Sequence, residues 1–205
     1  TPPDGYIAAE DVKFTVSHYG EPVEVPMSDQ GFKVSFVKED LNGNPLSGAS
    51  CELKLVGENG DLTTIDAWTS TETPHVMEDR LIVGATYRYH EEKAPDGYGY
   101  SKDIEFTIGA DGTIENAHYV GNGIGEGEIE VDGNTLRLKD APTRFRILKT
   151  DKVGNAIKGA KLVLRAENGD VVDAWVTDGN PHMIEGKLIV GNTYILEEDT
   201  APKGY

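Results

Sequence analysis

Hydrophobic and polar residues alternate along residues 32–39, which is the pattern of a β-strand with one buried face. Phe32, Val34 and Phe36 share one face, and Lys38 ends the same row. Burying an ammonium group costs several kcal/mol unless a partner compensates for the lost hydration. We therefore expect Lys38 to be paired, deprotonated or chemically consumed.

Short runs rich in Val, Ile, Tyr and Thr continue through the next hundred residues, and turn-forming Asn-Gly and Asp-Gly pairs separate many of them. Several short strands punctuated by such turns are typical of a β-sandwich. The sequence therefore predicts an all-β protein. The expected strands are residues 32–39, 50–56, 63–69, 80–91, 103–108, 114–120 and 128–139.

An internal repeat organises the chain. The segment from Lys38 to Ala49 recurs from Lys149 to Ala160, an offset of 149 − 38 = 111 residues. Asp-Ala-Trp and Leu-Ile-Val-Gly motifs also occur twice, and the Pro-Asp-Gly-Tyr sequence near the N-terminus recurs at residues 95–98. A repeat at this spacing predicts tandem copies of one supersecondary unit.

The repeat divides the chain into the back half of one unit at residues 1–30, a complete unit at 31–142 and the front half of a further unit at 143–205. Two interpretations are open. The chain is a window on a longer tandem array, or the front half is completed by residues 1–30 of a neighbouring chain through strand addition.

The composition of the chain argues against some classes of binding partner. The chain has 36 acidic and 19 basic residues and a formal net charge of −17, which argues against nucleic acid and anionic membranes. No apolar run is long enough to span a bilayer, so we expect no membrane insertion in this segment. The single cysteine, Cys51, rules out an intrachain disulfide and is expected to be a small buried apolar residue.

Two further apolar rows end in a carboxylate. Glu91 follows two tyrosines on one face of its strand, and Asp140 follows two leucines on one face of another. Together with Lys38, the complete unit presents one Lys, one Glu and one Asp inward. Matching positions in the flanking half-units hold Lys149, Glu198 and Asp29, and Asp140 and Asp29 are again 140 − 29 = 111 residues apart.

This constellation has two interpretations. In the first, it is a buried salt bridge or a set of strand-end residues that reach solvent. In the second, apolar surroundings favour a neutral amine beside a protonated Asp, a second carboxyl shuttles protons, and an isopeptide bond forms with loss of water. A metal site near Pro74-His75 or Pro181-His182 has too few ligands, so we expect no metal and no cofactor.

The motif Tyr-x-Tyr-x-Glu-x-x-Ala-Pro-x-Gly-Tyr at residues 87–98, and its variant with Leu in third place at 194–205, resemble the signature of CnaB-type (SpaA-type, prealbumin-like) domains of Gram-positive pilins and surface adhesins. The resemblance implies tandem immunoglobulin-like sandwiches that form an isopeptide bond by themselves. It implies that Lys38 is the nucleophile, Asp140 the electrophile and Glu91 the proton shuttle. Many members carry Asn where this chain has Asp140, so water rather than ammonia would leave here.

The resemblance also implies a function: a stalk or backbone module of a pilus or cell-wall-anchored adhesin, outside a Gram-positive cell. The expected partners are neighbouring domains or copies of the same protein, and the bond is a single self-modification rather than enzymatic turnover. The alternative is an adhesin module that binds a host matrix protein or glycan through an insertion at residues 109–134. Deleting such an insertion is expected to abolish host binding with little loss of stability.

Overall fold

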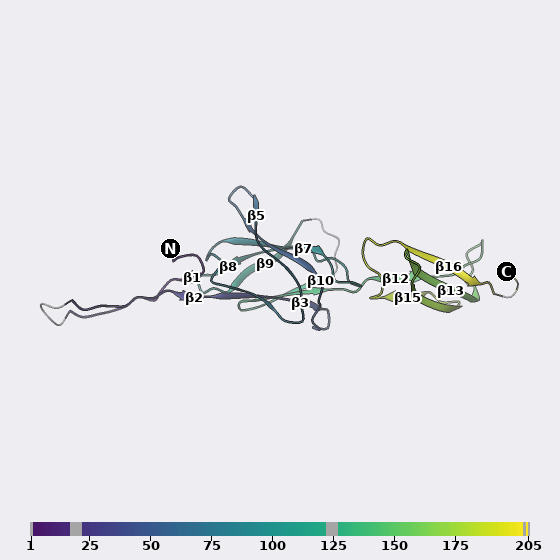
Figure 1. Cartoon of the computed structure of the whole chain (residues 1–205), viewed down its shortest axis with the longest axis horizontal. Coiled ribbons are helices and arrows are strands. Elements are labelled where there is room, and N and C mark those ends of the chain that lie inside the picture. Colours follow the sequence, from purple (N-terminus) through teal and green to yellow (C-terminus); the bar gives the residue numbers. More distant parts are fainter. Residues whose placement is uncertain (1, 17–21, 122–126, 203, 205) are drawn as a thin grey trace.

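The complete repeat unit forms a sandwich of two facing β-sheets (Figure 1). The computed structural model describes residues 2–16, 22–121, 127–202 and 204. In one sheet the strand order is β10-β11-β3-β6, and in the other it is β5-β4-β7-β8-β9. The strands of these sheets are β3 (Lys33–Asp40), β4 (Ser50–Val56), β5 (Leu62–Thr69), β6 (His75–Glu78), β7 (Thr86–Lys93), β8 (Asp103–Ile108), β9 (Ile114–Val120), β10 (Gly127–Asp132) and β11 (Thr135–Asp140).

The first and last strands of this central domain are neighbours. β3 and β11 run parallel, with Phe36 opposite Leu136 and Lys38 opposite Leu138, while the other strand pairs in the two sheets are antiparallel. The alternating rows seen in the sequence point into the space between the sheets and build one core, as the period of two requires. The fully buried members of that core include Val34, Leu53, Met77, Leu81, Tyr87, Tyr89, Ile104, Phe106, Leu136 and Leu138.

Two expected strands are wrong in extent. The stretch 80–91 is not one strand: residues 80–85 form a turn region between β6 and β7. Leu81 in that region is only 1% exposed although it lies outside any strand, because the turn folds its side chain into the core. The stretch 128–139 is a hairpin, with Asp132 opposite Thr135 at its tight turn.

Residues 109–134 form much of the sandwich edge rather than an appended loop. β9 pairs with β8 and β10 pairs with β11, while residues 122–126 lie outside the described part of the chain. Ile114 belongs to the core and is 6% exposed, and the partly buried Ile129 packs against the same core. We therefore expect deletion of this stretch to destabilise the domain, contrary to the expectation from the sequence.

Residues 143–202 repeat the front half of the central domain. They form a two-stranded sheet, β12-β15, and a three-stranded sheet, β14-β13-β16. By the repeat, β12 corresponds to β3, β13 to β4, β14 to β5, β15 to β6 and β16 to β7. The bounds are β12 (Arg144–Ile147), β13 (Lys158–Ala166), β14 (Val171–Asp178), β15 (His182–Glu185) and β16 (Tyr194–Thr200).

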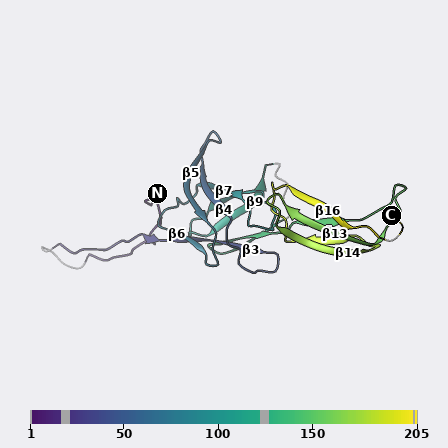
Figure 2. The ribbon, with the colours of Figure 1, turned by 45° about the vertical axis from the view of Figure 1, so that its right-hand side comes forward.

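The residues before the central domain form an extended arm. Its base is a pair of short antiparallel strands, β1 (Tyr6–Ile7) and β2 (Gln30–Gly31), and the described residues 8–16 and 22–29 project away from the sandwich (Figures 1 and 2). The arm and the C-terminal unit lie at opposite ends of the central domain in both views. In the described residues, no helix long and apolar enough to cross a membrane is found.

The same backbone junction joins each segment to the next. At the first junction the N–H of Phe32 donates to the carbonyl of Gly5 (3.2 Å), and the N–H of Asp79 donates to the carbonyl of Phe32 (3.0 Å). At the second, the N–H of Thr143 donates to Gly97 (2.8 Å) and the N–H of Gly186 donates to Thr143 (2.9 Å). At both junctions, the glycine of a Pro-Asp-Gly-Tyr turn therefore accepts a backbone hydrogen bond from the start of the following unit.

Candidate functional site

Lys38, Glu91 and Asp140 meet inside the central sandwich. The Nζ of Lys38 lies 2.5 Å from Oδ1 of Asp140 and 3.1 Å from Oε1 of Glu91. The side chain of Lys38 is 2% exposed and both carboxylates are 0% exposed. The structure thus brings together the three residues that the sequence singled out in this unit, and it excludes their being strand-end groups that reach solvent.

The two sheets position the three side chains independently. Pairing of β3 with β11 sets Lys38 opposite Leu138, so Asp140 follows on the same face one pleat further along. Glu91 comes from β7 in the facing sheet, where it lies opposite Cys51. The backbone N–H of Ser101 donates to Oε2 of Glu91 at 2.6 Å and leaves Oε1 directed toward the amine.

The site holds two carboxylates and one ammonium in apolar surroundings. Burial raises the pKa of Asp140 to about 7; the positive charge of Lys38 opposes this rise and the negative charge of Glu91 adds to it. Oδ2 of Asp140 is buried without a hydrogen-bond partner in the described structure, and Oε1 of Glu91 has only its 3.1 Å ion pair with Lys38. A proton on one carboxyl removes the excess negative charge of the site. It also turns a buried oxygen that lacks a hydrogen-bond donor into a donor itself.

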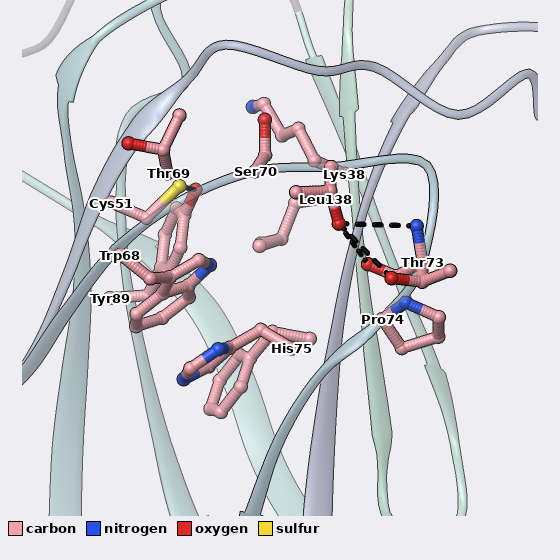
Figure 3. A pocket seen from close by; sticks show the side chains of 12 residues that line it. Lys38, Cys51, Trp68, Thr69, Ser70, Thr73, Pro74, His75, Tyr89 and Leu138 are labelled. Atoms are coloured by element: carbon pink, nitrogen blue, oxygen red, sulfur yellow. Dashed lines mark hydrogen bonds between the residues drawn. The ribbon is translucent and has the colours of Figure 1, made fainter.

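A cavity of about 240 Å³ adjoins the site, with Lys38 among its lining residues. Figure 3 shows the Lys38 and Cys51 side chains in one part of this pocket and the stacked rings of Trp68 and His75 in another. The Tyr89 hydroxyl donates to Sγ of Cys51 at 3.0 Å. The sequence predicts a buried Cys51, which its 2% exposure confirms. The contact between Tyr89 and Cys51 is not predictable from either strand alone, because only the β4–β7 pairing brings the two residues together.

The second set of residues is only partly assembled. The Nζ of Lys149 lies 3.1 Å from Oε2 of Glu198, the same separation as between Lys38 and Glu91. Asp29 lies on the arm, where its Oδ1 accepts a hydrogen bond from the N–H of Ala9 at 3.1 Å. Within one chain the structure therefore joins two members of this set and leaves Asp29 elsewhere.

The repeated histidines have a structural role. His75 stacks on Trp68 with ring centroids 4.1 Å apart, and its Nε2 lies 3.0 Å from Oδ2 of Asp66. His182 and Trp175 repeat the stack at 4.2 Å. Among the residues that the structure describes, no group of three or more His, Cys, Asp or Glu side chains could hold a metal ion.

The repeat unit also matches a known family. The family model described as "SpaA: Prealbumin-like fold domain" matches residues 32–120 and 143–205. The chain belongs to this family. The match to the SpaA family covers β3 to β9 of the central domain and the C-terminal unit, and it leaves out β10 and β11. It agrees with the immunoglobulin-like sandwich seen here.

Several solved structures resemble this SpaA-family chain. The C-terminal fragment of pilus adhesin SpaC from Lactobacillus rhamnosus GG is 21% identical with a TM-score of 0.43, over 86% of this chain and 78% of that one. The shaft pilin SpaA of the same organism is 14% identical with a TM-score of 0.40, over 84% and 89%. The pilus adhesin RrgA from Streptococcus pneumoniae is 17% identical with a TM-score of 0.48, over 59% and 16%.

This chain spans about a quarter of the length of the longer SpaC structure that it matches. In the open form of SpaC, 87% of this chain aligns with 25% of that chain. A search among curated proteins finds no match.

Proposed function

We propose that this chain is a load-bearing stalk module of a pilus or surface adhesin on a Gram-positive cell, locked by an isopeptide bond between Lys38 and Asp140. The observation that carries the proposal is the buried contact of Lys38 with Asp140 and Glu91. Membership in the SpaA family supports the pilus or adhesin role, and the repeated backbone junction supports a stalk of stacked units.

The proposed bond needs a neutral amine and a protonated carboxyl. Transfer of one proton from the ammonium of Lys38 to Asp140 produces both in the same site, and burial, which raises the pKa of Asp140 to about 7, favours the protonated carboxyl that this transfer requires. The Nζ lone pair attacks Cγ of Asp140, a nitrogen–carbon bond forms, and a proton passes from Nζ to Glu91. Glu91 returns that proton to the departing hydroxyl, the carbon–oxygen bond breaks, and water leaves.

Proximity lowers the activation barrier of a reaction that is slow between free groups. Strand pairing holds amine and carboxyl together before the reaction, so the step is effectively unimolecular. Each chain reacts once and is not regenerated, which makes this a self-modification without turnover.

Such a bond suits a protein under tension. β3 and β11 are the first and last strands of the domain and lie side by side. A bond between them prevents the two strands from separating when the ends of the domain are pulled apart. Force applied at the two ends of the domain then passes through a covalent link rather than through a ladder of hydrogen bonds.

Intact mass of the folded chain tests the proposal. One bond removes one water, about 18 Da, and the mass deficit is expected to vanish in the Lys38→Arg, Asp140→Ala and Glu91→Gln variants. Lys33→Arg on the exposed face of the same strand is the matched control and should keep the deficit. A wild-type chain with the full calculated mass would reduce the site to a buried salt bridge.

The proposed location is tested separately. Antibodies raised against the chain should label intact cells of the source bacterium without permeabilisation. Labelling that requires permeabilised cells would contradict a surface stalk while leaving the bond chemistry untouched.

A further inference from the structure

The five residues from Gly97 to Ser101, called segment 97–101 below, lie between the candidate site and the C-terminal unit. They connect β7 to β8 and belong to no strand, although Tyr98 forms an isolated antiparallel bridge with Pro142. The C-terminal unit begins at residue 143, directly after that bridge, and lies at one end of the central domain (Figure 1). The segment therefore adjoins both the reacting groups and the start of the next unit.

Segment 97–101 fixes the carboxylate of Glu91. The backbone N–H of Ser101 donates to Oε2 of Glu91 at 2.6 Å, while Oε1 of the same carboxylate lies 3.1 Å from Nζ of Lys38. A carboxylate with one oxygen held by a backbone N–H does not rotate freely. The position of the Ser101 backbone therefore sets the direction in which the proposed proton shuttle points.

The same segment also fixes the strand end that carries Asp140. The N–H of Gly99 donates to the carbonyl of Ala141 at 3.0 Å, and the bridge of Tyr98 with Pro142 follows one residue further along. Ala141 is 6% exposed, so this pairing lies inside the domain. One short segment thus holds two of the three reacting groups, although the two carboxylates lie on facing sheets.

The C-terminal unit binds the start of segment 97–101 through Thr143. The N–H of Thr143 donates to the carbonyl of Gly97 at 2.8 Å, and its hydroxyl has two carbonyls within reach, that of Leu188 at 2.8 Å and that of Gly97 at 3.1 Å. The N–H of Gly186 donates to the carbonyl of Thr143 at 2.9 Å. Thr143 therefore links the segment to the turn at residues 186–188 of the next unit.

Segment 97–101 needs this support because it lies outside the strands of the two sheets. Residues 98–101 are half-buried, and parts of a protein with few strand hydrogen bonds open at a lower free energy than strands do. A displacement of about 1 Å in a reacting group can slow a reaction about a hundredfold. Contacts that hold the segment in place are thus expected to affect the rate at the site.

We propose that packing of the C-terminal unit on segment 97–101 positions Glu91 and Asp140, so that the central domain forms its bond fastest once the following unit has folded. This inference rests on the bond chemistry of the proposed function. Thr143 is a positioning residue, since it acts through the segment and does not touch the reacting atoms. In a stalk of such units, cross-linking of one unit would follow the seating of its neighbour.

The rate of water loss tests this inference. Chain isolated in denaturant before folding is refolded and followed by intact mass, while circular dichroism reports folding in the same samples. Thr143→Val keeps the shape and the backbone N–H but removes the hydroxyl contacts, so the loss of about 18 Da should become about tenfold slower. Thr143→Ser retains the hydroxyl and should restore the wild-type rate.

Thr113→Val is the matched control for this change. The hydroxyl of Thr113 donates to Asp111 at 2.6 Å in the turn before β9, and Thr113 lines a hollow together with Gln30 and Gly31 at the base of the arm. The arm lies at the opposite end of the domain from the C-terminal unit (Figure 1). The same substitution at this position should leave the rate of water loss unchanged.

A change inside the C-terminal unit separates the effect of the unit from that of Thr143 alone. Leu164 on β13 is 4% exposed and belongs to the core of that unit. Leu164→Asp buries a charge there, which should unfold the unit and slow water loss at least as much as Thr143→Val. A normal rate in Leu164→Asp would show that the segment is positioned without the next unit, and would overturn the inference.

Exchange of the Gly99 and Ser101 amide protons, measured by NMR, provides a readout that does not need the bond. Both should exchange about tenfold faster in Thr143→Val than in the wild type, and at the wild-type rate in Thr113→Val. A wild-type chain with the full calculated mass would overturn the proposed function, and exchange would still decide whether the C-terminal unit orders the segment. Unchanged exchange and unchanged water loss in Thr143→Val would overturn the inference and leave the bond in place.

Discussion

The backbone of Gly97 packs against the backbone of Gly186 where the central domain meets the C-terminal unit. Gly97 has a φ of +86°, and a Cβ at this position would overlap the carbonyl oxygen of Gly186. Gly5 meets Asp79 in the same way at the preceding junction. This repeated contact of backbone with backbone sets the spacing between successive units and leaves no room for a side chain.

Replacing Gly97 with Ala should loosen the junction. The left-handed φ alone costs about 1 kcal/mol for a non-glycine residue, and the overlap with Gly186 adds a displacement of the two units. We expect broader interdomain motion in small-angle X-ray scattering. Gly43→Ala is the matched control, because Gly43 has a φ of +84° and open space around its Cβ position. Equal scattering curves for the two variants would argue against a rigid junction.

Glu91→Gln should leave the domain folded but much less stable. The amide keeps the size of the side chain and cannot act as the proton shuttle, so the Lys38–Asp140 bond should not form. A cross-link across 102 residues contributes about 4–5 kcal/mol in the chain-entropy description used for disulfides. Denaturant unfolding should show a loss of this size, whereas Glu92→Gln, the exposed neighbour, should change the unfolding free energy by less than about 1 kcal/mol.

Bond formation should slow at acidic pH. The pKa of Asp140 is raised from its ordinary 3.8 to about 7 beside the positive charge of Lys38, so below about pH 7 the site holds an ammonium and a protonated carboxyl. That state carries one proton more than the neutral amine and protonated carboxyl that react. Chain isolated unfolded and then refolded should therefore lose water at a rate that falls about tenfold per pH unit below that pKa and levels off above it. Time-resolved intact mass at about pH 5 and about pH 8 measures this. A rate that falls above about pH 7 would contradict proton transfer from Lys38 to Asp140.

Cys51 should be inert in the folded protein. Burial raises the pKa of its thiol to about 11, the Tyr89 hydroxyl donates a hydrogen bond to its sulfur, and the residue is 2% exposed. Reactivity of cysteine follows its thiolate fraction and its accessibility. Iodoacetamide at neutral pH should therefore modify the chain only in denaturant, as read by mass. Equal labelling with and without denaturant would show that the core opens readily.

Strand periodicity alone predicts which side chains of the site point into the core. A residue two positions beyond a buried one lies on the same face of a strand whatever the sheet around it, so Lys38, Glu91 and Asp140 could be placed inward from their own local rows. Their mutual distances could not be obtained this way, because Glu91 lies on the opposite sheet. Whether the facing sheets bring the three rows to one point depends on sheet order and register.

The limits of the sequence analysis lie where the chain leaves regular strands. Leu81 belongs to an apolar run that resembles a strand, but its backbone turns, and burial alone does not distinguish a buried turn from a buried strand. Residues 109–134 resembled an insertion because the arm lacks them. The comparison was misleading, since the arm does not fold as a sandwich of its own.

The sequence by itself determined the all-β class, the repeat and the inward rows, because these depend on local periodicity and on self-similarity. Only the tertiary structure decided that Lys38 touches both carboxylates, that the same backbone junction recurs between units, and that Lys149 and Glu198 meet while Asp29 lies at the far end of the molecule. The physical reason is that these relationships join residues about a hundred positions apart. Sheet pairing and steric fit between units set their distances, and neither is encoded in any single strand.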